Sequence, residues 1–263
     1  MHSSINIAFR TAETSDEVYA QQLQSLLEIP TAEPGRLDEF THLLLLDETG
    51  LSLQSLLSKS GAIKRLPTRV DFADPTLNYR RQTSGKQQGI AKAVGLNRHE
   101  PMHVLDLTAG LGKDAFILAS LGCRLTMLES SPLIFSLLND GLLRAKQSED
   151  AELREIVERM VLHHELAEDW LQAIDKGESP KPDVIYLDPM FPARNKQAAV
   201  KRDISLLQEV LPAATEPDAL LEAAIACKVK RVVLKQPGSK PSGKHHRASF
   251  IVPGKSAYFE IFS

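Results

Sequence analysis

One stretch, residues 103–130, constrains the fold of this chain more than any other. It reads HVLDLTAGLGKDAFILASLGCRLTMLES. A short apolar run ends at Leu107, a turn holds Gly110 and Gly112, and an apolar segment and a second apolar run follow. This spacing predicts a strand, a glycine turn, a helix of about three turns and a second strand. Such a unit is typical of α/β folds, in which the helix N-terminus faces a ligand at the carboxyl edge of a parallel sheet.

The residues of the turn favour a nucleotide-like ligand. A side chain at Gly110 or Gly112 would hold a ligand away from the backbone. Glu129 follows Gly110 by 19 residues, which is where a carboxylate can accept the hydroxyl groups of a ribose. A glycine pair alone can simply turn the chain, but the strand, the helix and the distal acid together favour a binding site.

The same turn also matches a relaxed dinucleotide-binding pattern, Gly110-x-Gly112-x-x-Ala115. An NAD-dependent oxidoreductase is therefore an alternative. Asp106 and Asp114 flank the turn, however, and their negative charges would oppose the binding of a pyrophosphate. The two carboxylates would instead attract a ligand with an ammonium and a sulfonium group, which favours S-adenosylmethionine.

A second motif lies in residues 183–192, DVIYLDPMFP, where an apolar strand ends at Asp188 and Pro189. Asp-Pro after a strand can form a simple turn. It also suits the chemistry of an exocyclic amino group, which is a poor nucleophile because it shares its lone pair with the ring. The Asp188 carboxylate and the Pro189 carbonyl could accept its N–H groups and direct the lone pair at a methyl donor. Phe191 would stack on the base, an interaction worth about 1–3 kcal/mol.

These motifs resemble those of a known family. Residues 106–114, DLTAGLGKD, resemble motif I of class I methyltransferases, and DPMFP resembles the [D/N]PP[Y/F] motif of amino-methyltransferases, with Met190 in place of the second proline. Over roughly residues 70–236 the chain resembles the small-subunit (16S) ribosomal RNA guanine-N2 methyltransferase J family. This resemblance implies a Rossmann-like α/β fold with a seven-stranded, mostly parallel sheet. It also implies methyl transfer from S-adenosylmethionine to the N2 amino group of a guanosine in 16S ribosomal RNA.

The chemistry of the two motifs and the resemblance to the family together give the expected site residues. The catalytic residues are Asp188, Pro189 and Phe191. The motif chemistry predicts that the cofactor contacts Asp106, Gly110, Gly112 and Glu129, and the resemblance adds Lys113, Asp114, Ser130, Leu166, Ala167 and Asp188. No metal ion is expected, because the histidines and cysteines lack the spacing of metal ligands.

The charge distribution suggests a polyanionic partner. The net charge is only −3, but residues 59–99 hold 9 basic and 2 acidic side chains, and residues 194–263 hold 12 and 6. Residues 228–255 contain eight Lys or Arg and no Asp or Glu. Such blocks favour an RNA-facing surface, although solvated loops are the usual alternative. The residues expected to contact RNA are Arg80, Arg81, Arg194, Lys196, Lys201, Arg202 and Lys235.

The chain is predicted to form two domains. Residues 1–75 are acidic and show short elements, namely a strand at 5–9, a helix through Ile29 and a hairpin at 41–54, so we expect a small N-terminal α/β accessory domain. Residues 76–263 are expected to form the methyltransferase domain, which ends in a hairpin of strands 250–252 and 258–262. Asp74-Pro75 is interpreted as a break between the two.

Composition narrows the class of protein. With 263 residues, 43% of them hydrophobic, the chain can bury a substantial core. Two isolated cysteines and the lack of a signal-like or membrane-spanning run predict a cytoplasmic protein. An amino-methyltransferase acting on DNA adenine or protein glutamine, and a non-catalytic RNA-binding module, stay open alternatives. The sequence predicts neither the oligomeric state nor which guanosine is modified.

Overall fold

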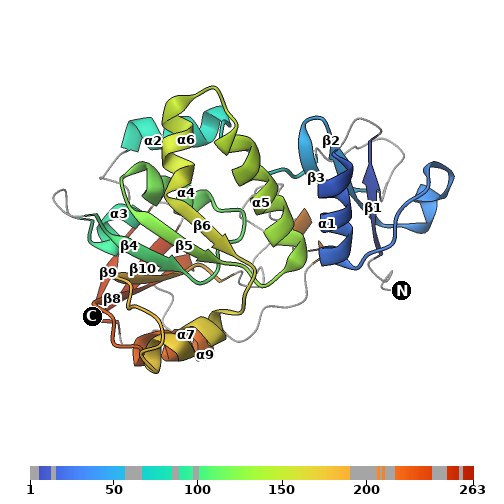
Figure 1. The fold of residues 1–263 in the computed structure, drawn as a ribbon. Coiled ribbons are helices and arrows are strands. Elements are labelled where there is room, and N and C mark those ends of the chain that lie inside the picture. Colours follow the sequence, from blue (N-terminus) through green and yellow to red (C-terminus); the bar gives the residue numbers. More distant parts are fainter. Residues whose placement is uncertain are drawn as a thin grey trace. The chain divides into compact units, whose positions relative to one another are not determined.

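A computed structural model describes most of the chain. The described residues are 6–12, 16–56, 67–84, 89–96, 101–189, 206–207, 209–210, 217–238, 248–254 and 257–263. Within these ranges no helix is both long enough and apolar enough to cross a lipid bilayer. The chain divides into two compact units (Figure 1), which are described separately below.

The first unit comprises residues 1–71, 131–144 and 192–213. Its three-stranded sheet has the order β1-β2-β3, with β1 parallel to β2 and β2 antiparallel to β3. Helix α1 begins after Asp16, whose carboxylate accepts hydrogen bonds from the N–H groups of Val18 and Tyr19 and so satisfies the free donors of its first turn. The elements are β1 (Ile7–Thr11), α1 (Glu17–Leu27), the 3₁₀ helix η1 (Pro34–Glu39), β2 (His42–Asp47) and β3 (Gly50–Ser55).

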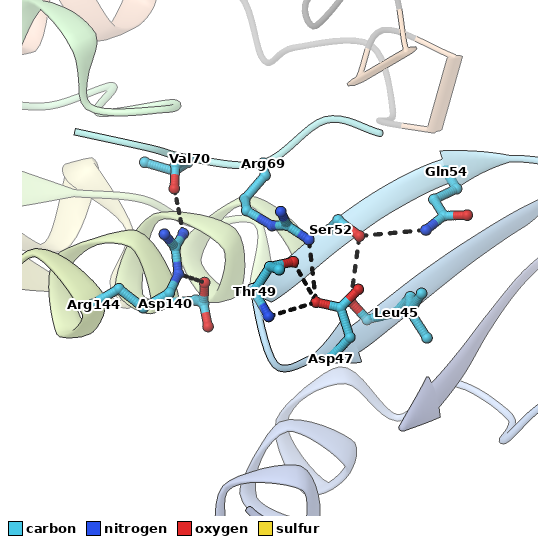
Figure 2. Close-up of polar contacts among 9 residues, drawn as sticks. All are labelled: Leu45, Asp47, Thr49, Ser52, Gln54, Arg69, Val70, Asp140 and Arg144. Atoms are coloured by element: carbon cyan, nitrogen blue, oxygen red, sulfur yellow. Dashed lines mark hydrogen bonds and ion pairs between the residues drawn. The ribbon is translucent and has the colours of Figure 1, made fainter. Parts of the chain in front are cut away.

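Polar contacts hold together segments of the first unit that are distant in sequence (Figure 2). At the hairpin between β2 and β3, Asp47 accepts hydrogen bonds from the Thr49 backbone at 2.8 Å and from Arg69 Nη2 at 3.3 Å. On helix α5 (Pro132–Lys146), Arg144 Nε contacts the buried Asp140 carboxylate at 2.8 Å and its Nη2 donates to the Val70 carbonyl. Because Asp140 is only 4% exposed, this pairing offsets the cost of burying its charge.

The second unit comprises residues 72–130, 145–191 and 214–263 and holds a seven-stranded sheet of order β6-β5-β4-β7-β8-β10-β9. Strands β6, β5, β4, β7 and β8 are parallel, and the final hairpin of β9 and β10 is antiparallel. The strands are β4 (His103–Asp106), β5 (Arg124–Leu128), β6 (Met160–His163), β7 (Val184–Leu187), β8 (Arg231–Pro237), β9 (Phe250–Val252) and β10 (Ala257–Phe262). The helices are α2 (Pro75–Ser84), α3 (Gly89–Val94), α4 (Lys113–Ser120), α6 (Ala151–Glu158), α7 (Ala167–Asp175) and α9 (Pro217–Ala226).

Side-chain alternation along β4, β7 and β8 places apolar residues of one core and the polar residues of the cluster described below on opposite faces of the sheet. Leu105, Ile185 and Leu234 share one core with α7 and α9, which lie side by side in Figure 1. Successive side chains of a strand point to opposite faces. The next residue of each strand, Asp106, Tyr186 and Lys235, therefore points to the other face, where Tyr186 and Lys235 reach helix α4.

The predicted fold class is confirmed: the chain forms a Rossmann-like α/β fold with a seven-stranded, mostly parallel sheet and a small N-terminal α/β unit. Asp74-Pro75 is the start of α2, because the Asp74 carboxylate accepts hydrogen bonds from the N–H groups of Thr76 and Leu77 and proline is favoured in the first helical turn. The domain boundary at residue 75 stays a prediction, and the first unit also takes in residues 131–144 and 192–213.

Candidate functional site

The glycine turn joins β4 to α4 in a conformation that favours glycine. Gly110 has a φ of +55° and Gly112, the residue that caps α4, has a φ of +70°. No side chain caps the N-terminus of this helix. The Gly110 N–H donates to Glu129 Oε2 at 3.0 Å. The turn and the distal acid, which the sequence assigned to one ligand, are thus in direct contact.

Thr108 connects the ends of β4 and β7. Its backbone N–H donates to Asp106 Oδ1 at 3.0 Å, and its Oγ1 accepts the backbone N–H of Asp188 at 2.7 Å. The parallel pairing of β4 with β7 places Asp106 opposite Tyr186, so both motifs end at the same edge of the sheet. The glycine turn after β4 and the DPMFP motif after β7 therefore contribute to one site.

Lys235 on β8 connects the carboxylates of the two motifs. Its Nζ lies 2.6 Å from Asp114 Oδ2 and 2.6 Å from Asp188 Oδ2. Tyr186 also donates its hydroxyl to Asp114 Oδ2, at 2.7 Å. The side chain of Asp188 is 38% exposed, whereas that of Asp114 is 17% exposed. Asp188 is therefore the carboxylate of this pair that a second ligand can reach more easily.

Burial and mutual repulsion hold protons on this cluster. The pKa of Asp106 is raised to about 8: burial is the main cause, the Thr108 N–H opposes the rise, and Asp114, Asp188 and Glu129 add to it. Asp106 is 3% exposed, so it is mostly protonated at neutral pH.

The pKa of Asp188 is raised less than that of Asp106. Burial raises the pKa of Asp188 to about 6, with Asp114 adding to the rise and Lys235 opposing it. Burial lowers the pKa of Lys235, but Asp114 and Asp188 outweigh this and raise it overall. Burial, followed by Asp114 and Asp188, raises the pKa of Tyr186 well above its usual value. At neutral pH the cluster therefore contains an ionised Asp188, a charged Lys235 and a neutral Tyr186.

The residues at the glycine turn fit S-adenosylmethionine. Four carboxyl groups, those of Asp106, Asp114, Asp188 and Glu129, converge at this edge of the sheet, and the Lys235 ammonium pairs with two of them. An excess of negative charge favours a ligand with sulfonium and ammonium groups. Glu129, 9% exposed beside Gly110, is suited to accept the ribose hydroxyls.

Other predicted cofactor residues lie at the same strand ends. Ser130 is exposed directly after Glu129, and its carbonyl lies 3.2 Å from His164 Nε2. Leu166, 53% exposed, caps the N-terminus of α7, and the buried Ala167 begins that helix. Lys113 is the first residue of α4. Their contacts with the cofactor stay predictions.

Several predicted residues lie outside the described part of the chain: Phe191, Arg194, Lys196, Lys201 and Arg202. Pro189 is described and buried. Arg80 and Arg81 lie on α2, and their contacts with RNA stay predictions. Lys235, predicted to contact RNA, lies within the carboxylate cluster, and its contact with RNA stays a prediction.

Two residues of this arrangement were missed from the sequence, Tyr186 and Thr108. From the sequence alone, Tyr186 was interpreted as an ordinary strand residue and Thr108 as part of the glycine turn. A hydroxyl at the end of an otherwise apolar strand is a signal that could have identified Tyr186, because a buried hydroxyl needs a hydrogen-bond partner.

Comparisons with known proteins agree with this geometry. A family model described as a putative SAM-dependent methyltransferase, SAM being S-adenosylmethionine, matches residues 35–263. The chain is 39% identical to a ribosomal RNA small subunit methyltransferase J from Thioalkalivibrio sulfidiphilus, over 99% of this chain and 98% of that protein. It is 42% identical to the protein of the same name from Cellvibrio japonicus, over 88% and 86%.

A solved structure extends the match to three dimensions. The crystal structure of a SAM-dependent methyltransferase from Neisseria gonorrhoeae is 30% identical and superimposes with a TM-score of 0.68, covering 97% of this chain and 95% of that one. The cofactor is therefore S-adenosylmethionine, as the turn predicted. The chain belongs to the ribosomal RNA small subunit methyltransferase J family of SAM-dependent methyltransferases.

Proposed function

We propose that this enzyme methylates the exocyclic N2 amino group of a guanosine in 16S ribosomal RNA of the small ribosomal subunit. The observation that carries this proposal is the position of Asp188. It is a partly exposed carboxylate at the tip of β7, joined through Thr108 to the strand end that begins the glycine turn.

Asp188 and Pro189 are proposed to bind the target amine. Among the described residues, Asp188 Oδ2 accepts from Lys235, while its Oδ1 has no hydrogen-bond partner. Oδ1 is thus available to accept one N–H of the amine, and the Pro189 carbonyl would accept the other. Holding both N–H groups favours a pyramidal nitrogen whose lone pair is free to react. Phe191 would stack on the base.

The reaction requires both a donor and a place for one proton. S-adenosylmethionine, when bound, supplies a methyl group on a sulfonium sulfur. The sulfur keeps the electron pair of the C–S bond when the methyl group is transferred. The nitrogen lone pair forms the new C–N bond, and the nitrogen must then lose one proton. Asp188, with a pKa raised to about 6 by burial, is ionised at neutral pH and can accept that proton on Oδ1.

The names of the relatives support an RNA substrate in the small subunit, and the two basic blocks of the sequence, 59–99 and 194–263, agree with a polyanionic partner. Because this substrate is ribosomal, the enzyme would act in the cytoplasm. Guanine N2 is the target that the resemblance of DPMFP to the family implies, and RNA contacts are proposed for Arg80, Arg81, Arg194, Lys196, Lys201, Arg202 and Lys235.

The test is methyl transfer from labelled S-adenosylmethionine. Small subunits and naked 16S RNA, both prepared from a strain that lacks this gene, are incubated with the enzyme and then digested to nucleosides. We expect label in N2-methylguanosine, with subunits prepared from the parent strain as the already methylated control.

The other functions give different results in the same experiment. Label in N6-methyladenosine from added DNA, or in glutamine of a ribosomal protein, would identify a different amino substrate. RNA binding without any incorporated label would indicate a non-catalytic RNA-binding protein. Either result would contradict the proposed function.

A further inference from the structure

The contacts of Lys235 indicate a role in addition to the RNA contact proposed above. Its ammonium lies within 2.6 Å of two carboxylates that come from different elements, Asp114 on α4 and Asp188 after β7. Its side chain is 24% exposed. An ammonium held between two carboxylates interacts strongly with both of them, because partial burial weakens screening by water.

The register of the sheet explains why Lys235 reaches this position. Tyr186 on β7 lies opposite Val233 on β8, and Lys235 is two residues further along β8, on the same face as Tyr186. On that face Tyr186 donates to Asp114 from β7 while Lys235 donates to it from β8. Helix α4 and the tip of β7 are therefore connected by one charged side chain.

Lys235 contacts only one oxygen of Asp188. The Nζ–Oδ2 contact at 2.6 Å orients the carboxylate, and Oδ1, which has no hydrogen-bond partner among the described residues, is directed to other ligands. We infer that Lys235 is a positioning residue that fixes the Asp188 carboxylate and keeps it ionised, so that Oδ1 can accept an N–H of the target amine. This inference rests on the proposed function and assigns a further residue to the same site.

The electrostatic surroundings of Asp188 explain the need for a cation. Asp114 on α4 repels its negative charge, Asp106 on β4 lies in the same cluster, and Tyr186 on β7 is neutral. Lys235 is the group that lowers the pKa of Asp188 against burial and Asp114. Without it, Asp188 would retain a proton at neutral pH, and a protonated carboxyl group would no longer be fully available as an acceptor.

The main variant is Lys235→Met, and Lys230→Met is its matched control. Lys230 also forms an ion pair with an aspartate, Asp183 at 3.0 Å, but at the opposite end of the same two strands. Single-turnover methyl transfer is measured between about pH 5.5 and pH 9. We expect Lys235→Met to be about tenfold slower near neutral pH, and to recover much of this loss at the alkaline end, because a rise of about two units in the pKa of Asp188 would leave only about a tenth of it ionised at pH 7.

Conservative variants separate charge from packing. Lys235→Arg keeps the charge and should restore the acid limb of the pH profile toward that of the wild type. Lys235→Gln keeps a hydrogen-bond donor without the charge and should show the alkaline shift, and it replaces the methionine variant if that protein does not fold. Lys230→Met should leave the profile unchanged. A Lys235→Met or Lys235→Gln profile with the wild-type acid limb would overturn the inference.

A direct titration does not depend on the RNA substrate. In protein labelled with ¹³C at the aspartate carboxyl carbons, the Asp188 signal is assigned by its loss in Asp188→Asn. We expect a midpoint at about 6 in the wild type and a higher midpoint in Lys235→Gln. A wild-type midpoint above 8, or equal midpoints in the two proteins, would contradict the role of Lys235. If the midpoints shift as expected but no label reaches guanine N2, the proposed substrate is wrong and the charge role of Lys235 stands.

Discussion

Asp106 lies at the end of β4 with 3% of its surface exposed, and its carboxylate accepts a hydrogen bond from the Thr108 N–H. Burial, with Asp114, Asp188 and Glu129, raises its pKa to about 8 in the folded protein, against roughly 4 in an unfolded chain. The folded state therefore binds one more proton than the unfolded state between these two values. Stability from this group is complete below about pH 4 and is lost as the pH rises toward 8.

Asp106→Asn should remove this dependence while keeping an oxygen for the Thr108 N–H. We expect the variant without cofactor to be more stable than the wild type near pH 8 by on the order of a few kcal/mol, with the difference shrinking toward pH 4. Urea unfolding at several pH values measures it. For Asp183→Asn the stability difference from the wild type should change with pH in the opposite direction, because the His103 N–H and Lys230 lower the pKa of Asp183. A difference between wild type and Asp106→Asn that does not change with pH would contradict this assignment.

At the scale of an element, the turn before α4 combines backbone strain with ligand access. Gly110 has a φ of +55°, and a Cβ there would meet only the Thr108 carbonyl, at 3.9 Å. Gly122, at the other end of α4, has a φ of +97° and nothing within 4 Å of an added Cβ. The two glycines thus have comparable backbone requirements, but only Gly110 is in contact with Glu129.

Gly110→Ala and Gly122→Ala should each reduce the free energy of unfolding by about 1 kcal/mol, the usual cost of a left-handed conformation for a residue with a Cβ. Only Gly110→Ala should also weaken the binding of S-adenosylmethionine, because its methyl group lies where the ligand approaches the backbone. Calorimetric titration and thermal unfolding of both variants measure the two effects. Equal cofactor affinities in the two variants would place the cofactor away from this turn.

The sequence predicted elements best where one pattern had one physical cause. The final hairpin of β9 and β10 was predicted within a residue of its observed limits. At Asp74-Pro75 the sequence indicated a break but not the helix that begins there, because the same two residues suit both a turn and the first turn of a helix. The distinction depends on the residues that follow, where Leu77 packs into the core.

The part of the site that local motifs specify was predicted from the sequence, and the rest was not. Asp106, Gly110, Glu129 and Asp188 follow from local motifs, and the structure brings them together. The contact of Lys235 with Asp114 joins residues 121 positions apart, and no local pattern specifies it. Lys235 ends an apolar run on a parallel strand, and strand register then determines which face it occupies. Register is a property of the sheet and not of the segment.

At the scale of the whole molecule, charge is concentrated in blocks, and the basic residues proposed to contact RNA next to the DPMFP motif lie outside the described residues. Lys201→Glu with Arg202→Glu should weaken RNA binding and flatten its dependence on salt, because each lost phosphate contact reduces the logarithmic slope by about 0.7–0.9. Lys146→Glu with Lys176→Glu makes the same change of charge at exposed positions in the acidic block and should leave the slope closer to that of the wild type. Equal slopes in the two double variants would move the RNA contact elsewhere.

Removal of the Asp188 carboxylate is the most direct test of the proposed chemistry. Asp188→Ala is compared with Asp183→Ala, which removes the aspartate at the opposite end of β7. Single-turnover methyl transfer to small subunits and calorimetric binding of S-adenosylmethionine are measured on both. We predict that Asp188→Ala still binds the cofactor measurably and transfers methyl about 10²–10³-fold more slowly than the wild type, while Asp183→Ala keeps most of its rate. Transfer at the wild-type rate by Asp188→Ala would contradict the account.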